Sequence, residues 1–336
     1  MPAPVVLRDT IAAISTGVTN FTSSGFGTPA GAIIVVCNAN STNNPQVNQF
    51  LSIGFWDGTN VRCCSMHSKD GSSSSEASRI LSTTHAVVQT RVDTFLVSSD
   101  WTISNITDGV RITMDTDGTG VERHAAVLLL PSSMNCKVGT FTPNTTQNGT
   151  ATSESLGFDP KALLFGCVGT TNTSGSAHAI LSYGACVDDG SLTQRQIMMF
   201  DRDGLSTTVT GMRVETDSCL GQFYNDSVTW TGEVTAMGSD DFTVTTRDGG
   251  SGSDIAAYMA IGNCEASLKT LTTPTSAVSD PVTGTGFQPE ALISSLIGRS
   301  TTDVNQQDLA VCVGMSDATQ DSAHSAESED AQGTSE

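Results

Sequence analysis

Gly157-Phe158-Asp159-Pro160-Lys161-Ala162-Leu163-Leu164 is the stretch that organises this chain, because it occurs three times in related form. Gly-Phe, then proline, then an apolar run also stands at residues 25–34 and at residues 286–293. Proline fixes φ and biases the preceding residue towards extended geometry, so each copy predicts a turn that leads into a strand. The three copies lie about 130 residues apart, which indicates an internal repeat.

Other landmarks recur at the same spacing. In each copy a glycine follows an apolar run and precedes an aspartate-bearing turn, at Gly54, Gly184 and Gly314. Five further pairs keep the period: Trp101 and Trp230, Asp117-Gly118 and Asp248-Gly249, Ala125-Ala126 and Ala256-Ala257, Asn135-Cys136 and Asn263-Cys264, Cys37 and Cys167. We therefore predict three consecutive units: 1–131, 132–262 and a partial third at 263–336 with an acidic end.

The third unit is predicted to hold only the first half of the repeat, because a counterpart of Trp101 and Trp230 would fall beyond residue 336. Its stretch from Asp317 to Glu336 is acidic and nearly free of large apolar residues, so by itself it is typical of a disordered segment. We expect that a longer native polypeptide or a partner subunit supplies the missing packing. If the chain stops here, exposed strand edges of the third unit should pair with a neighbour.

Each unit is predicted to be built from strands. Residues 32–37, 162–165 and 291–293 are apolar at consecutive positions, which predicts strands that are covered on both faces. Residues 110–114 and 242–245 alternate, and Asp57-Gly58 and Asp189-Gly190 predict hairpin turns. Since no window shows a helical apolar stripe, we predict an all-β fold of tandem β-sandwich domains, two complete and one partial, of about 130 residues each.

Composition excludes several function classes. The 336 residues include 35 acidic and 15 basic side chains, for a formal net charge of −20. That balance argues against a surface that binds nucleic acid, which needs clustered Lys and Arg. No apolar run is long enough to span a membrane, and Met1-Pro2-Ala3-Pro4 lacks the pattern of a signal peptide.

The nine cysteines do not form a metal-binding pattern. There is no C-x-x-C motif and no Cys/His cluster at zinc-finger spacing. The repeat places Leu296 where Cys37 and Cys167 stand, so we interpret that position as core, and Cys186, Cys219 and Cys312 as small buried thiols. Cys136 and Cys264, at the unit junctions, are expected to be the most exposed. The odd number and irregular spacing suit synthesis in a reducing cytoplasm.

We predict no catalytic, cofactor-binding or metal-binding residues. Acidic turns at residues 115–118, 188–190 and 201–204 are better explained as hairpin turns than as calcium loops, since an EF-hand loop from Asp115 would require Glu where Ala126 stands. The histidines do not recur between units, and no nucleophile-elbow, zincin or phosphate-loop motif is present. Trp101 and Trp230 could stack on sugars, but equivalent aromatics in repeats more often anchor a core.

The recurring Gly-Phe-x-Pro-x-Ala segments at residues 157–165 and 286–293 resemble a domain of structural proteins from tailed bacteriophages, especially marine ones. In both, a Gly/Ser/Thr-rich loop and a strand ending in glycine follow, and residues 248–261 are similar as well. The first unit departs from the pattern, with Gly27-Thr28 before Pro29 and Gly31 before Ala32. The resemblance implies a virion component and assigns no catalytic residue.

Our leading prediction is a non-enzymatic capsid decoration or cement protein, located on the outer surface of the virion and made in the bacterial cytoplasm. It would contact the major capsid protein or other virion proteins as a homo-oligomer, with a trimer favoured. The repeat begins almost at Met1 without a helical shaft, and the negative charge suits a surface that faces water rather than packaged DNA. The alternative is a tail fibre or tail-associated adhesin that binds host polysaccharide, and a depolymerase is a third possibility.

Overall fold

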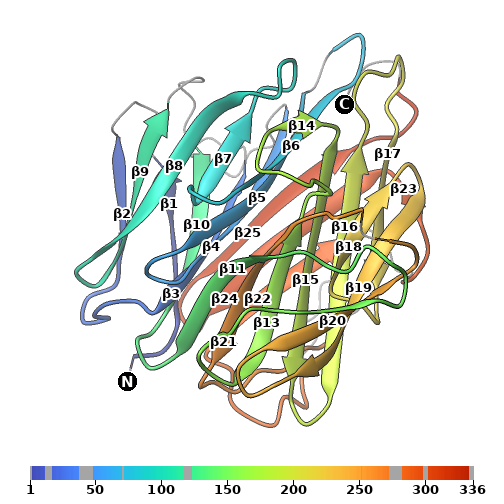
Figure 1. Ribbon diagram of the computed structural model, residues 1–336. Helices are drawn as coiled ribbons and strands as arrows, with labels where there is room; N and C mark the ends of the chain where they lie inside the picture. Colours follow the sequence, from blue (N-terminus) through green and yellow to red (C-terminus); the bar gives the residue numbers. More distant parts are fainter. Residues whose placement is uncertain are drawn as a thin grey trace.

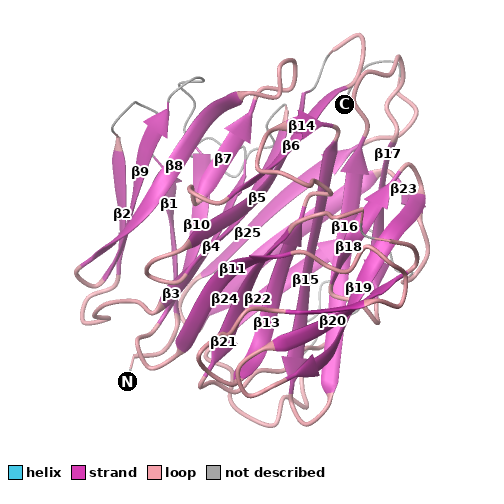
Figure 2. Ribbon diagram, in the orientation of Figure 1, coloured by secondary structure: helices cyan, strands magenta, loops and turns pink. Residues whose placement is uncertain are grey.

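The computed structural model describes residues 2–11, 17–37, 48–69, 72–116, 123–250, 252–271, 282–297 and 302–332. It confirms the all-β prediction: 59% of the described residues lie in strands, and none of them lies in a helix (Figure 2). The strands form five sheets, which we name A to E. Within the described ranges, no helix is long and apolar enough to span a membrane.

Sheets A and B form the first sandwich. Sheet A has seven strands in the order β1-β10-β3-β4-β5-β6-β14, and sheet B has four in the order β2-β9-β8-β7. The strands of sheet A are β1 (Val5–Ile11), β10 (Arg123–Leu130), β3 (Gly31–Cys37), β4 (Gln49–Trp56), β5 (Val61–Lys69), β6 (Glu76–Ser82) and β14 (Ser176–Ala177). Those of sheet B are β2 (Val18–Thr22), β9 (Gly109–Thr116), β8 (Val97–Ile106) and β7 (Val87–Thr90).

Sheets C and D form a second sandwich with the same strand order. Sheet C runs β11-β21-β13-β15-β16-β17-β23 and sheet D runs β12-β20-β19-β18. The strands of sheet C are β11 (Asn135–Phe141), β21 (Ala256–Gly262), β13 (Pro160–Cys167), β15 (Ala179–Asp188), β16 (Leu192–Asp201), β17 (Thr210–Glu215) and β23 (Gln306–Gln307). Those of sheet D are β12 (Thr150–Thr152), β20 (Phe242–Arg247), β19 (Ser227–Met237) and β18 (Leu220–Tyr224).

Sheet E has three strands, in the order β22 (Ala291–Ile297), β24 (Leu309–Asp317) and β25 (Asp321–Ser328). This is the order of β3-β4-β5 and of β13-β15-β16, and Gly314 pairs with Ser294 as Gly184 pairs with Phe165. Among the described residues, no four-stranded sheet covers its outer face, where Leu292 is 50% exposed and Leu296 42%. The prediction that residues 291–293 are covered on both faces is therefore wrong.

The inner faces of sheets A, C and E share one hydrophobic core. Leu51, Leu181 and Val311 stand at corresponding positions of β4, β15 and β24, and all three are buried in that cluster. In Figure 1 the orange-red strands β22, β24 and β25 run behind the blue strands of the first sandwich and the green strands of the second. Two separate cores fill the sandwiches, one between sheets A and B and one between sheets C and D.

The acidic stretch that begins at Asp317 contains a regular strand, β25. In β25 the residues alternate, so that His324, Ala326 and Ser328 are buried and the intervening residues are mostly exposed. His324 Nδ1 lies 2.9 Å from the Sγ atom of Cys37, at the end of β3. From here on we call residues 1–131, 132–262 and 263–336 the first, second and third segments. The first segment thus supplies a surface against which the acidic stretch packs, as it was expected to need.

The strand register corrects one predicted equivalence. Val36, Cys167 and Leu296 are the corresponding residues, because they pair with Ser52, Ser182 and Cys312, which themselves correspond. Cys37 is one residue further along and pairs with Leu51. The first two units are 131 residues apart along β3 (Val36 and Cys167) but 130 apart along β4 (Ser52 and Ser182), so the predicted spacing of 130 was one residue off in β3. A shift of one residue turns a strand side chain to the opposite face.

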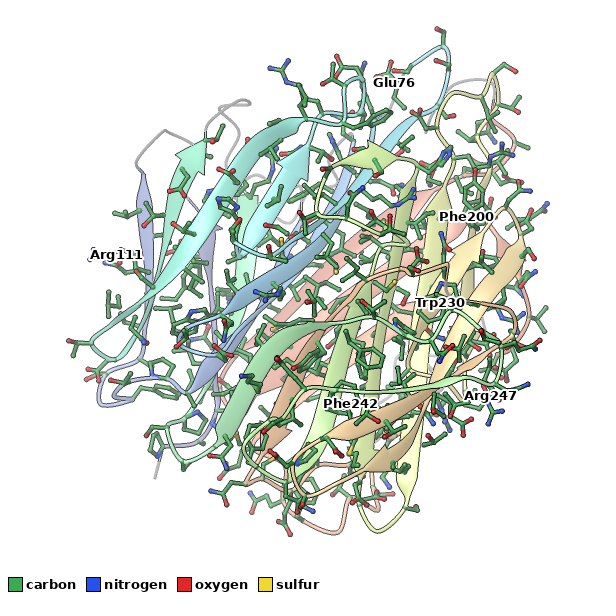
Figure 3. The ribbon with its side chains drawn as sticks, viewed as in Figure 1. Glu76, Arg111, Phe200, Trp230, Phe242 and Arg247 are labelled. Carbon is green, nitrogen blue, oxygen red and sulfur yellow. The ribbon has the colours of Figure 1, made fainter. Side chains whose placement is uncertain are left out.

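The predicted tryptophan anchors and hairpin turns are confirmed. Trp101 and Trp230 are both 0% exposed, each in the core between the two sheets of its sandwich. Figure 3 shows Trp230 in the second sandwich. Gly58 and Gly190 close the β4–β5 and β15–β16 hairpins with φ of 90° and 103°, a left-handed conformation that favours glycine. The landmark at Asp117-Gly118 lies outside the described residues.

Candidate functional site

The histidines that could support catalysis have structural contacts. Burial lowers the pKa of His67 and of His324 to about 4, so both are neutral at physiological pH. The Nδ1 atom of His67 lies 2.8 Å from the carbonyl oxygen of Thr90, and the Nδ1 atom of His178 accepts a hydrogen bond from the Asp203 amide at 2.9 Å. Backbone groups therefore position the rings of His67 and His178, and the ring of His324 lies against the Cys37 thiol.

The cysteines are free thiols, and most are buried. Burial raises the pKa of Cys63, Cys167 and Cys186 to about 12, which keeps them as thiols rather than nucleophilic thiolates. Cys186 and Cys219 are buried as predicted, and Cys312 is half-buried. Cys136 and Cys264 are half-buried against the shared core rather than open to solvent.

One acidic group brings together residues from distant parts of the sequence. Carboxylate oxygens of Glu215, Asp217 and Asp303 lie within 4.8 Å of one another, a spacing that could surround a cation. Arg213 already pairs with Glu215. Asp303 accepts hydrogen bonds from Thr216, at 3.0 Å from its amide and 2.9 Å from its hydroxyl. These contacts hold the loop before β23 against the end of β17.

A set of four hydrogen bonds joins the first and second segments. Asp203, Gly204 and Leu205 follow β16 and form what we call the first hook. The Ala77 amide donates to Asp203 Oδ1 at 2.9 Å, and the Gly204 amide donates to the Ser75 carbonyl at 2.7 Å. The Ser75 amide donates to the Leu205 carbonyl at 2.8 Å, and the Leu205 amide donates to Ser75 Oγ at 3.0 Å. This hook fixes the start of the edge strand β6.

The same four bonds recur at the junction between the second and third segments. Asp330, Ala331 and Gln332 follow β25 and form the second hook. The Thr210 amide donates to Asp330 Oδ1 at 3.0 Å, and the Ala331 amide donates to the Thr208 carbonyl at 2.9 Å. The Thr208 amide donates to the Gln332 carbonyl at 2.9 Å, and the Gln332 amide donates to Thr208 Oγ1 at 2.8 Å. Gly204 and Ala331 share a positive φ, of 78° and 61°.

A short strand accompanies each hook. β14 extends sheet A by pairing Ser176 with Arg79, and β23 extends sheet C by pairing Gln306 with Met212. Each segment therefore completes the sheet of the segment before it. The residue after each short strand accepts the amide of the hook aspartate, through His178 Nδ1 in one case and Asp308 Oδ1 in the other.

A further contact joins the third segment back to the first. Asp57, in the β4–β5 turn, accepts a hydrogen bond from the Val138 amide of β11 at 2.8 Å. Asp317, in the corresponding β24–β25 turn, accepts one from the Val6 amide of β1 at 2.6 Å. β1 and β11 hold the same place in sheets A and C. The hydrogen bond from β11 to the Asp57 turn, which joins the second segment to the first, therefore has a counterpart from β1 to the Asp317 turn, which joins the first segment to the third. The three segments meet in a closed ring.

A buried carboxylate lies inside this ring. Ser68 and Asp201 occupy corresponding positions of β5 and β16, and the Ser68 hydroxyl donates to Asp201 Oδ2. Asp201 is 1% exposed, and its Oδ1 atom has no hydrogen-bond partner among the described residues. Burial raises the pKa of Asp201 to about 6, the Ser68 bond lowers it, and the charge of Asp203 raises it further.

The sequence predicted the internal repeat but did not predict the hooks. We favour the hooks as the functional contacts of this molecule, because they join its segments. Asp203 was visible only within the acidic turn at residues 201–204, and Asp330 only within the acidic stretch from Asp317 to Glu336. A signal did exist, since Asp-Gly follows the same strand at residues 203–204 and at 70–71, and the latter pair lies outside the described residues. A comparison of this chain with protein-family models, curated proteins and solved structures finds no match. Function must therefore be argued from the ring of sheets and its junctions.

Proposed function

We propose that this protein is a non-enzymatic structural component of a bacteriophage virion, and that it decorates the outer surface of the capsid and stabilises the shell through protein–protein contacts. The observation that carries the proposal is the closed ring of sheets A, C and E, joined by repeated contacts. A ring of three related segments suits a position where three copies of a shell protein meet. The net charge of −20 favours a surface that faces water and is repelled by packaged DNA.

The ring also changes what we expect of the oligomer. Sequence reasoning favoured a homotrimer, and the ring within one chain offers another way to match threefold symmetry. Three corresponding faces already meet within one chain, so a single chain can occupy a threefold position without two further copies. We therefore propose one chain for each such position, in contact with the major capsid protein.

The buried tryptophans weigh on the adhesin alternative. A sugar-stacking platform needs an accessible aromatic face, whereas Trp101 and Trp230 are 0% exposed and the Nε1 atom of Trp230 donates to the buried Asp254 at 2.8 Å. The alternative then depends on polar loop tips alone. No contact described above favours it, and we give it second place.

A reconstruction of the virion tests the proposal. We expect density for one chain at threefold or quasi-threefold positions of the head, with the pseudo-threefold ring aligned on the local axis. Density confined to the tail would refute the capsid assignment. Binding of the purified protein to host polysaccharide would support the adhesin, and cleavage of that polysaccharide would identify an enzyme.

A further inference from the structure

The edge of β25 occupies a place that is filled in the other two sheets. In sheet A, β5 is followed by β6, which pairs with it from Cys63↔Ser82 to Lys69↔Glu76. In sheet C, β16 is followed by β17, which pairs with it from Gln196↔Glu215 to Asp201↔Thr210. In sheet E the series ends at β25, and among the described residues no strand pairs with its second edge.

The hairpin geometry shows which groups this edge offers. The Asp317 amide donates to the Gln320 carbonyl at 3.0 Å, so these two residues form the hydrogen-bonded pair that closes the turn. Hydrogen-bonded and non-hydrogen-bonded pairs alternate along an antiparallel ladder. Asp321, Ala323, Ser325 and Glu327 therefore direct their N–H and C=O groups away from β24. Arg8 Nη1 already donates to the Asp321 carbonyl at 3.2 Å, and the other three residues are exposed.

We propose that β25 accepts an extended strand from a partner virion protein, which adds antiparallel to it as β6 and β17 add to β5 and β16. Unpaired edges are templates for strand addition, in which main-chain hydrogen bonds supply much of the affinity. In the other two sheets β6 and β17 fill this place, so the fold itself shows that a strand fits there. The inference does not depend on whether the protein lies on the head or the tail.

The equivalent strands define the chemistry of the partner segment. In β17 the side chains that enter the shared core are Met212 and Val214, and in β6 they are Ala77 and Leu81, so the arriving strand needs small or apolar residues at alternate positions. The region that it would meet is acidic: Asp317, Asp321, Glu327, Glu329 and Asp330 fall in residues 309–332, which contain no Lys or Arg. A neutral or basic strand is therefore favoured over an acidic one.

A labelled peptide with the sequence of residues 208–216 is a suitable probe, because it carries this pattern together with Arg213. We expect it to bind the full chain, and a version with Glu215→Lys to bind more tightly at low salt. A version with Met212→Asn and Val214→Asn should lose at least tenfold in affinity. Amide exchange should slow at Ala323, Ser325 and Glu327 when the peptide is bound.

Ser325→Pro in the protein provides the matched test, since it removes an outward amide and leaves the ladder with β24 in place. We expect at least a tenfold loss of peptide affinity, whereas Ser325→Ala, which keeps the amide, should bind normally. Thermal unfolding of both variants checks that they are folded. Absence of peptide binding, or equal binding by Ser325→Pro and Ser325→Ala folded proteins, would overturn the proposal.

Discussion

At the scale of single residues, three glycines at corresponding positions have different neighbours. A Cβ atom added at Gly54 would lie 2.3 Å from the Ala86 carbonyl oxygen, and one at Gly184 would lie 2.0 Å from that of Cys219. Ala86 and Cys219 directly precede β7 and β18, which are strands of the covering sheets. At Gly314 the nearest atom is the Ser294 hydroxyl oxygen at 2.7 Å, a side-chain atom that can rotate away. The surroundings of these glycines thus reflect that a second sheet covers sheets A and C and that, among the described residues, none covers sheet E.

We expect Gly54→Ala and Gly184→Ala each to destabilise the protein by about 2 kcal/mol or more, because backbone must move to admit the methyl group. Gly314→Ala is the matched control and should cost less than about 1 kcal/mol. Urea unfolding of the three variants measures the difference. Similar losses at all three positions would mean that the third sheet is as tightly covered as the other two.

A second residue-scale prediction concerns Asp201. Burial raises the pKa of this carboxyl from 3.8 to about 6, so the folded protein holds its proton to higher pH than the unfolded chain does. Stability therefore falls as the pH rises from about 4 to about 6, by about 3 kcal/mol for a shift of this size. Asp201→Asn cannot ionise, and it should raise the melting temperature at pH 7.5 but not at pH 4.

The exposed Asp189 provides the control for that measurement. Asp189→Asn removes the same charge from a hairpin turn and should change the melting temperature equally little at both pH values. If Asp201→Asn changed the melting temperature by the same amount at both pH values, the Asp201 carboxyl would not be the group that makes stability depend on pH.

At the scale of elements, each hook holds adjacent segments through four hydrogen bonds, one of which runs from a backbone amide to the carboxylate of an aspartate. Asp203 accepts the amide of Ala77 at the first junction, and Asp330 accepts the amide of Thr210 at the second. A carboxylate that accepts a hydrogen bond from a partly buried amide contributes more than a neutral acceptor. The two junctions should therefore respond alike to loss of this side chain.

We expect Asp203→Ala and Asp330→Ala each to cost about 1.5 to 3 kcal/mol in the free energy of unfolding. Hydrogen exchange should accelerate locally, in β6 for the first variant and in β17 for the second. Asp189→Ala again serves as the control for loss of an aspartate. A uniform acceleration across the whole chain would indicate that the hooks are not separate local contacts.

The elements also show how far sequence could lead. Proline-marked turns and apolar runs predicted β3 and β13 and their burial on both faces, and Gly54, Gly184 and Gly314 fixed the true alignment of the segments. The two-residue strands β14 and β23 were not predictable, because Ser176-Ala177 and Gln306-Gln307 share no side-chain pattern and their ladders are formed by backbone atoms. The register error at Cys37 arose because the first two units are 131 residues apart along β3 (Val36 and Cys167) but 130 apart along β4 (Ser52 and Ser182), and one residue changes which face a strand side chain occupies.

At the scale of the whole molecule, the chain contains its own threefold set of faces. Sheets A, C and E cover one another around the shared core, so association of three chains is not required to bury it. We expect light scattering to give the mass of a single chain, 34.9 kDa, in dilute solution. A stable species of three times that mass would restore the homotrimer as the working unit.

The third segment should be essential to that arrangement even though it lacks a covering sheet. The sequence predicts two complete sandwich units before residue 263, and that prediction by itself implies that they fold without residues 263–336. In the structure, Val311, Val313 and Met315 of β24 enter the same core as Leu51 of β4 and Met199 of β16, so truncation after Gly262 uncovers apolar side chains of both remaining sheets.

We expect the truncated chain to keep its β-sheet circular dichroism, because the cores between sheets A and B and between sheets C and D remain intact. It should nevertheless bind a hydrophobic dye strongly and self-associate. A chain truncated after Gln332, which retains β25 and the second hook, is the matched control and should stay monomeric without binding the dye. A monomeric, dye-free protein after removal of residues 263–336 would show that the two sandwiches cover each other unaided, and the ring would then be dispensable for folding.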